Sequence, residues 1–295
     1  MWIACLSASD ENSETGYLFL SNAHPRRSVI FASRAMRIER QASPAAKWSS
    51  RIVSFALVLM LTAGAAHRFG FIETVPFLWS LFLAGGLALI ALLTGAFALW
   101  QMWEHGLTGL RAASWGVFLS ILLLVPFGVG AVLYTTHPPL TDVMTDLTYP
   151  PQFTYADKLR HEPMNPIMPI SQANGLVHIA AYPELTPRRY EHARDQVVTA
   201  VLTLLERRSW MLLTPEPLQE PEEGSAVTTI EAAAKTFLLG IPFDVAIRVE
   251  DRADATYVDM RSVSRYGPHD LGMNAAQIQS FLQDLDLMMS EMGSV

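Results

Sequence analysis

Three long apolar segments restrict what this chain can fold into more than any other feature. They cover about residues 52–71, 75–103 and 113–134. A helix that spans the hydrocarbon core of a bilayer needs about 20 mostly apolar residues. The second and third segments meet this length. The first is marginal, because Arg68 near its end must extend its charged group to the interface, and a buried soluble helix is the alternative for it. The sequence therefore predicts a three-helix transmembrane anchor over residues 51–135.

The Lys and Arg residues around these segments predict an orientation. Five of them precede the first helix: Arg34, Arg37, Arg40, Lys47 and Arg51. Arg68 follows the first helix and Arg111 lies between the second and third. Cytoplasmic loops carry an excess of Lys and Arg, which places the N terminus in the cytoplasm. We therefore expect a multi-pass protein of the cell inner (plasma) membrane, with the chain after about residue 135 in the periplasm or outside the cell.

The apolar segments carry few groups that could move an ion or a proton. Glu73 and Glu104 lie at helix ends, and no carboxylate lies inside the second or third segment. Transporters and pumps need ionisable groups at depth in the membrane. We therefore expect an anchor, with the lipid bilayer as its partner.

Residues 1–50 form an N-terminal tail without a sustained apolar period. No basic region precedes an apolar core, so residues 1–35 do not resemble a signal peptide. Two interpretations remain open: a disordered tail, or a misassigned start codon with translation beginning at Met36.

The chain after the anchor is acidic. Residues 136–295 carry 12 Lys and Arg against 22 Asp and Glu. This balance argues against a nucleic-acid or anionic-lipid surface, because both need clustered basic residues. Cys5 is the single cysteine, which excludes an intrachain disulfide and a cysteine-based metal site. The histidines show no HExxH spacing, and no P-loop or G-x-G-x-x-G follows a strand. We expect no metal and no cofactor.

Two regions follow the anchor. Residues 136–175 are rich in proline, which excludes long helices, and predict an extended connector. Residues 176–295 predict an extracytoplasmic α+β domain. Its expected elements, in order, are a helix from Pro187 to about Arg208, strands at 210–213, 227–239, 244–250 and 256–265, and a helix at 274–289. Consecutive strands joined by short turns favour an antiparallel sheet of about four strands, with the two helices packed on one face.

The stretch YVDMRSVSRYGPHDLGMN, residues 257–274, holds the densest group of polar side chains. Side chains of a strand alternate between its two faces. The face away from the helices should carry the charged set: Glu231, Lys235, Arg248, Glu250, Asp259, Arg261 and Arg265. One interpretation is a solvated ladder of ion pairs, each contributing about 0.2–1 kcal/mol. The other is a concave site in which the arginines hold an anionic ligand.

The remaining candidates have structural interpretations. Ser262 and Ser264 fall on the opposite strand face from Arg261, and no G-x-S-x-G motif surrounds them, so we expect hydrogen bonding at the sheet edge. Asp270 and Asn274 are expected to cap and orient the last helix.

At these residues the chain resembles a known family. The runs TxIEAxAxTFLxGxxxDVAIRV and VDxRSxSRxGxxDLGxNAxxI, with TDVMTDLTYPPQF and YPEL before them, resemble the domain of unknown function 1499 family. The likeness covers most of residues 138–287, and the three helices before it resemble the membrane-anchored subgroup. Family members often carry paired acids where this chain has Phe243-Asp244, and a basic residue where it has Gln277. The resemblance implies a fold and a placement, and no assigned reaction.

Three functions stay open from the sequence. The first is a non-enzymatic envelope protein whose outer domain binds a ligand or a protein partner, either an envelope protein or a small anionic ligand. The second is a hydrolase-like enzyme that uses Asp259, Arg261 and Asp270. The third is a transporter accessory subunit. A carboxylate of strongly raised pKa in a closed pocket would favour the enzyme.

Overall fold

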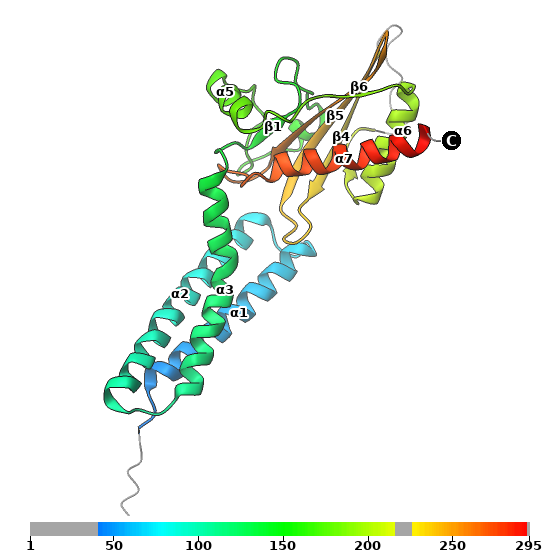
Figure 1. The fold of residues 1–295 in the computed structure, drawn as a ribbon. Helices are drawn as coiled ribbons and strands as arrows, with labels where there is room; N and C mark the ends of the chain where they lie inside the picture. Colours follow the sequence, from blue (N-terminus) through cyan, green and yellow to red (C-terminus); the bar gives the residue numbers. More distant parts are fainter. Residues whose placement is uncertain (1–40, 216–225, 294–295) are drawn as a thin grey trace, which may run out of the picture. The chain divides into compact units, whose positions relative to one another are not determined.

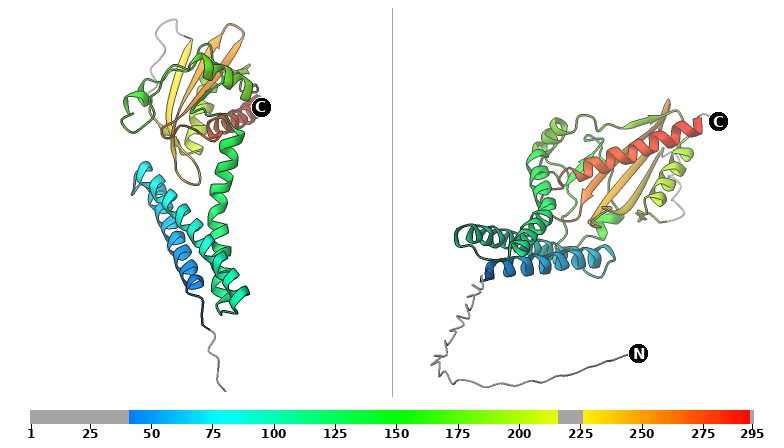
Figure 2. Two further views of the ribbon diagram at one scale, coloured as in Figure 1. Left: turned by 90° about the vertical axis from the view of Figure 1, so that its left-hand side faces the viewer. Right: turned by 60° about the horizontal axis from the view of Figure 1, so that its bottom comes forward.

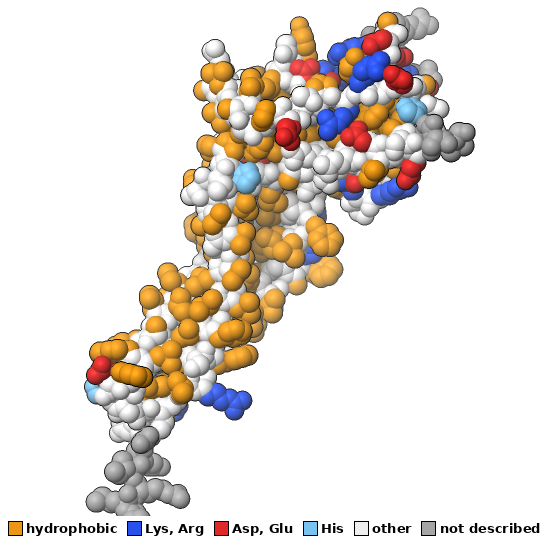
Figure 3. All heavy atoms as spheres, viewed as in Figure 1, with side chains coloured by type: hydrophobic (Ala, Val, Ile, Leu, Met, Phe, Trp, Pro, Cys, Tyr) orange, Lys and Arg blue, Asp and Glu red, His pale blue; other side chains and the backbone are white. Residues whose placement is uncertain are grey.

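A computed structural model describes residues 41–215 and 226–293 of the 295-residue chain (Figure 1). The N-terminal tail up to residue 40, including Met36, lies outside these residues. Three helices come first: α1 (Pro44–Arg68), α2 (Thr74–His105) and α3 (Leu110–Thr136). All three are long and apolar enough to cross a membrane. Apolar side chains gather over them, whereas most charged side chains in this view lie over the rest of the chain (Figure 3).

The first helix begins eight residues earlier than the apolar segment. Ser43 caps it by accepting a hydrogen bond from the backbone N–H of Ala46, and Pro44 occupies the first turn, where its missing N–H costs nothing. The helices pack through small residues. Ser49 of α1 donates to the carbonyl of Ala91 in α2 at 2.7 Å, and a methyl group added at Gly95 would lie 2.7 Å from the Ser49 hydroxyl.

The chain after α3 is α+β, as predicted. It contains the strands β1 (Asp142–Met144), β2 (Arg188–Tyr190), β3 (Met211–Leu212), β4 (Val227–Lys235), β5 (Pro242–Arg252) and β6 (Ala255–Ser264). Its helices are α4 (Tyr155–Lys158), α5 (Gln172–Ala181), α6 (Arg194–Arg207) and α7 (Met273–Gly293). All strand pairs are antiparallel, in the order β1-β6-β5-β4-β3, and β2 also pairs with β6.

Three details of the predicted elements are wrong. The sheet has six described strands, because β1 and β2 both add to β6. The helix expected from Pro187 begins at Arg194, since residues 188–190 pair with Thr256–Val258 instead. The long strand expected to reach Leu239 ends at Lys235, and residues 236–241 form the turn into β5, with Gly240 at φ 68°.

The core lies between the sheet and the helices α6 and α7, which cover one face (Figure 2). Apolar side chains at alternate positions of β4, β5 and β6 point to one face of the sheet. The apolar stripes of α6 and α7 pack against this face. Trp210 stacks on Phe281 with ring centroids 5.6 Å apart and meets Phe243 edge to face. The core members include Val197, Val201, Leu204, Ile230, Ile247, Val258, Met260, Ile278, Phe281 and Leu285.

Candidate functional site

The face of the sheet away from α6 and α7 carries the charged set, and its centre is not open to solvent, although Lys235 at the end of β4 is exposed. Asp259, Arg261 and Glu231 are each at most 3% exposed. Residues 142–170 of the predicted connector supply partners for these groups, through β1, α4 and the loops around them. The expectation of a solvated ladder is therefore wrong. The reason is tertiary: a proline-rich segment without sheet or helix periodicity folds back over the polar face.

Arg261 on β6 is bound to the start of this segment. Its Nε and one terminal nitrogen donate to the two carboxylate oxygens of Asp142 at 3.0 and 2.6 Å. Further donor bonds reach the carbonyls of Pro151 and Met168. The guanidinium also lies 5.3 Å from the ring centroid of Phe153. Four of its five N–H groups thus have described acceptors, so Arg261 is not free to hold an anionic ligand.

Arg248 and Asp259 pair across β5 and β6. They are direct cross-strand neighbours, and the closest nitrogen–oxygen distance is 2.6 Å. Arg248 also binds Asp146 at 3.1 Å and donates to the carbonyl of Tyr149. Thr145 donates to Asp259 at 3.2 Å. Burial raises the pKa of Asp259 despite these partners, whereas the hydrogen bonds at Asp146 leave its pKa below the usual value although burial opposes them.

Asp244 on β5 accepts from two arginines. Arg265 donates to Oδ1 at 2.6 Å and to Oδ2 at 3.1 Å. Arg160, from the connector, donates to Oδ2 at 2.7 Å. The carboxylate is fully buried. Arg160 also donates to the carbonyls of Asn165, Val263 and Ser264. Two cations around one carboxylate make this triad a fixed structural joint between the connector and the sheet.

Glu231 on β4 binds backbone rather than a basic residue. Its carboxylate accepts from the N–H groups of Thr154, Tyr155 and Ala156 at 2.6 to 3.2 Å. These are the first N–H groups around α4, which lack partners within the helix. Glu231 therefore serves as the cap of α4 in place of a local residue.

The four candidates on the other side form the joint to α7. Ser262 donates to the side-chain oxygen of Asn274 at 2.8 Å, and the Asn274 amide donates to Ser264 and to the carbonyl of Thr141. Asp270 accepts from the N–H groups of Gly272 and Asn274 at 2.9 Å each. Burial raises the pKa of Asp270. Asp270 thus caps α7, and Asn274 fastens the helix to β6.

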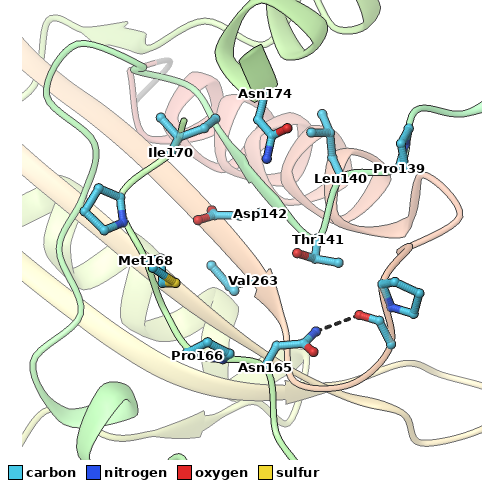
Figure 4. A pocket seen from close by; sticks show the side chains of 13 residues that line it. Pro139, Leu140, Thr141, Asp142, Asn165, Pro166, Met168, Ile170, Asn174 and Val263 are labelled. Carbon is cyan, nitrogen blue, oxygen red and sulfur yellow. Dashed lines mark hydrogen bonds between the residues drawn. The ribbon is translucent and has the colours of Figure 1, made fainter. Parts of the chain in front are cut away.

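A cavity of about 370 Å³ lies beside the Asp142–Arg261 pair, between the connector, the end of β6 and α5. Figure 4 shows the carboxylate of Asp142 and the amide of Asn174 directed into it. Asn165 is held on its wall by donating to the carbonyl of Gly267 at 2.7 Å. Four prolines stiffen the wall, and no Lys, Arg or His lines it; the lining residues are Pro139, Leu140, Thr141, Asp142, Asn165, Pro166, Met168, Pro169, Ile170, Asn174, Val263, Gly267 and Pro268.

The sequence patterns did not predict the partners of the charged set: Asp142, Asp146, Arg160, and Asp244 as an acceptor for two arginines. They also did not predict α5, which Ser171 caps by accepting from the N–H of Asn174. A signal for the acids exists in TDVMTD at residues 141–146, a short strand pattern with two aspartates. Among the described residues, no group of three or more His, Cys, Asp or Glu side chains could hold a metal ion.

The family match agrees with this geometry. Residues 142–285 match the model of the family described as "Protein of unknown function (DUF1499)". Residues 142–285 form a DUF1499 domain. The DUF1499 match begins at Asp142, the first residue of β1. The charged set and its partners Asp142, Asp146, Arg160 and Asp244 form a charged layer, and this layer lies within the matched range. Three apolar helices precede it, as in the membrane-anchored subgroup. No curated protein matches the chain, and no solved structure matches it.

Proposed function

We propose that this DUF1499 protein is a multi-pass protein of the cell inner membrane whose outer-facing domain is a ligand-binding module. The observation that carries the proposal is the cavity beside Asp142 and Arg261. Apart from Asp142, which lines the cavity, the arginines and acids on this face of the sheet bind one another, which makes them the frame of the cavity rather than its ligand contacts. Rigid proline-lined walls with a few convergent polar groups are typical of small-molecule sites.

The lining of this cavity favours one class of ligand. Its single ionised group is Asp142, whose oxygens keep acceptor capacity beyond the two bonds from Arg261. Asn174 and Thr141 add an amide and a hydroxyl. The ligand we propose is therefore a small cationic or neutral molecule with N–H or O–H donors and an apolar part that contacts Met168 and Ile170. An anion would meet the Asp142 carboxylate without a lining cation to offset it.

The binding module is favoured over a hydrolase. Asp259 and Asp270 have raised pKa values, yet neither lines the cavity. Asp259 is bound by Arg248 and Thr145, and Asp270 is bound by backbone N–H groups at the start of α7. A general acid or base must reach the substrate atom within hydrogen-bond distance, and these carboxylates point into protein.

The ligand proposal is tested by binding to a panel of small amines, amides and carboxylates of matched size. Thermal unfolding of the full chain should shift with members that carry donors and not with the carboxylates. Asn174→Trp should abolish the shift by filling the cavity mouth. Gln172→Trp is the matched control, because Gln172 is on the same helix but does not line the cavity. Carboxylates that bind best, or equal loss in both variants, would overturn the proposal.

The orientation is tested separately. The basic residues Arg34, Arg37 and Arg40 before α1, with Lys47 and Arg51 in its first turns, support a cytoplasmic N terminus. An alkaline phosphatase fused after Val295 should then be active, since this enzyme matures only outside the cytoplasm. A cytoplasmic reporter active at the same position, with an inactive phosphatase, would contradict it.

A further inference from the structure

A second cavity, distinct from the one beside Asp142, is rich in basic side chains. It encloses about 530 Å³ between the ends of β4 and β5, the segment 159–164 and the end of α1. Arg68, Arg208, Lys235 and Arg265 line it together with His161, and no Asp or Glu is among its lining residues. The domain is acidic as a whole, so this local gathering of cations goes against the net charge.

Two of these cations are compensated and two are not. Arg265 is bound to Asp244, and Arg208 is bound to Asp284 at 2.6 Å. Arg68 and Lys235 have no ion pair within residues 41–215 and 226–293, and both are exposed. A smaller adjoining cavity of about 250 Å³ shares Lys235 and Arg265 and adds one carboxylate, Glu73. Two uncompensated cations thus face a single acid, which leaves the joined space positive.

Apolar side chains project beside this cavity. Phe237 and Leu238, in the turn between β4 and β5, are 90% and 79% exposed. Phe69 and Phe71, between α1 and α2, are 76% and 82% exposed. The end of α1 meets the turn between β4 and β5: a ring nitrogen of His67 lies 2.7 Å from the carbonyl oxygen of Leu239. Because α1 ends at Arg68, this junction falls where a spanning helix leaves the hydrocarbon layer.

We propose that the basic cavity binds the phosphate headgroup of an anionic phospholipid, with its acyl chains beside Phe237 and Leu238. The lipid belongs to the leaflet at the C-terminal end of α1, which is the outer leaflet in the orientation proposed above. Arg68 and Lys235 supply the charge-assisted hydrogen bonds to the phosphate, for which guanidinium and ammonium groups are suited. The exposed apolar pair supplies contact with the chains. The occupant is a lipid rather than a free ion, because the site adjoins helices that are themselves apolar toward their surroundings. This goes beyond the ligand module proposed above.

The test is lipid retention by the full-length protein in neutral detergent, measured by native mass spectrometry. Phosphatidylglycerol and phosphatidylcholine are added in equal amounts, and inorganic phosphate is added in a separate arm. Wild type should retain phosphatidylglycerol in preference to phosphatidylcholine. The Arg68→Gln, Lys235→Gln double variant should lose at least about tenfold of that retention, since each basic residue near a membrane contributes about 1 kcal/mol. Lys235→Gln alone, an exposed change at a strand end, should lose about fivefold.

Arg252→Gln is the matched control. It removes one positive charge at the opposite end of β5 and should leave lipid retention unchanged. Three results would overturn the proposal: equal retention of the two lipids by wild type, unchanged phosphatidylglycerol retention in the double variant, or displacement of the lipid by an equal concentration of inorganic phosphate. The last result would assign the site to a free anion.

Discussion

Arg261 and Asp142, 119 residues apart in the chain, are joined by two parallel hydrogen bonds of 3.0 and 2.6 Å. The bidentate geometry fixes β1 and the following segment on the sheet as well as neutralising the charge. The arginine side chain is 3% exposed. This pair shows that residues 142–170 are part of the folded domain, and it sets the expected behaviour of fragments and variants.

A fragment of residues 140–295 should be soluble and should unfold cooperatively. A fragment of residues 176–295 should not, because it lacks Asp142 and Arg160. It leaves Arg261 without its acid and Asp244 with Arg265 alone, beneath an open sheet face. Circular dichroism during thermal unfolding distinguishes the two. A cooperative transition of similar midpoint in the shorter fragment would contradict the structural role of residues 142–170.

Arg261→Ala should destabilise the 140–295 fragment by about 3–5 kcal/mol, since it leaves a partly buried carboxylate unpaired. Arg189→Ala is the control. Arg189 pairs with Glu191 at the surface, where solvent screens the pair, so its removal should change the free energy of unfolding little. Denaturant unfolding measures both changes. A loss of less than about 1 kcal/mol for Arg261→Ala would show that the arginine stabilises the fold no more than an exposed ion pair does.

Glu231→Gln should cost about 1.5–3 kcal/mol, the range for hydrogen bonds to a charged group. The amide keeps one acceptor oxygen but presents an NH₂ group to N–H donors of Thr154–Ala156. Glu250→Gln is the comparison, because Glu250 binds the partly exposed Arg252. Equal free energies of unfolding for the two variants would show that the cap of α4 stabilises the domain no more than the surface pair of Glu250 does.

His178 should make stability depend on pH. It is buried, accepts from the backbone N–H of Met144 at 3.2 Å, and burial lowers its pKa below 6.5. As the pH falls, His178 therefore takes up a proton in the unfolded chain before it does so in the folded one. The stability that neutral His178 contributes is complete above about pH 6.5 and is lost as the pH falls toward the folded pKa.

The raised pKa values of Asp259 and Asp270 act in the opposite direction at lower pH, so the measurement must isolate His178. His178→Gln keeps an acceptor for Met144 and removes the titration. The difference in unfolding free energy between wild type and this variant should shrink between about pH 7 and pH 5. A difference that stays constant over this range would refute the assignment.

Local patterns in the sequence predicted the elements whose neighbours are close in the chain. The period-two alternation in β6 placed Asp259 and Arg261 on one face, and the runs after Val227 gave β4, β5 and β6 as an antiparallel sheet. The three apolar helices followed from length and hydropathy alone.

The burial of the charged layer could not be predicted in this way. Asp142 lies 119 residues from its partner Arg261, and Arg160 lies 84 residues from its partner Asp244; no local periodicity encodes such pairs. Proline content in 136–175 indicated a linker, although prolines also suit a rigid irregular layer over a sheet. The spacing of apolar residues predicted that Arg188–Tyr190 belong to the helix that follows. In the structure they pair with β6 as a strand, which local spacing does not show.

The cavity beside Asp142 is proposed to hold a small ligand. The most direct measurement places a photoreactive amino acid at position 174 of the full chain, irradiates growing cells, and determines the mass of the intact protein. We expect a defined small-molecule adduct with the photoreactive amino acid at position 174, and none with the same amino acid at position 172. Identical adducts at both positions, or none at 174, would contradict it.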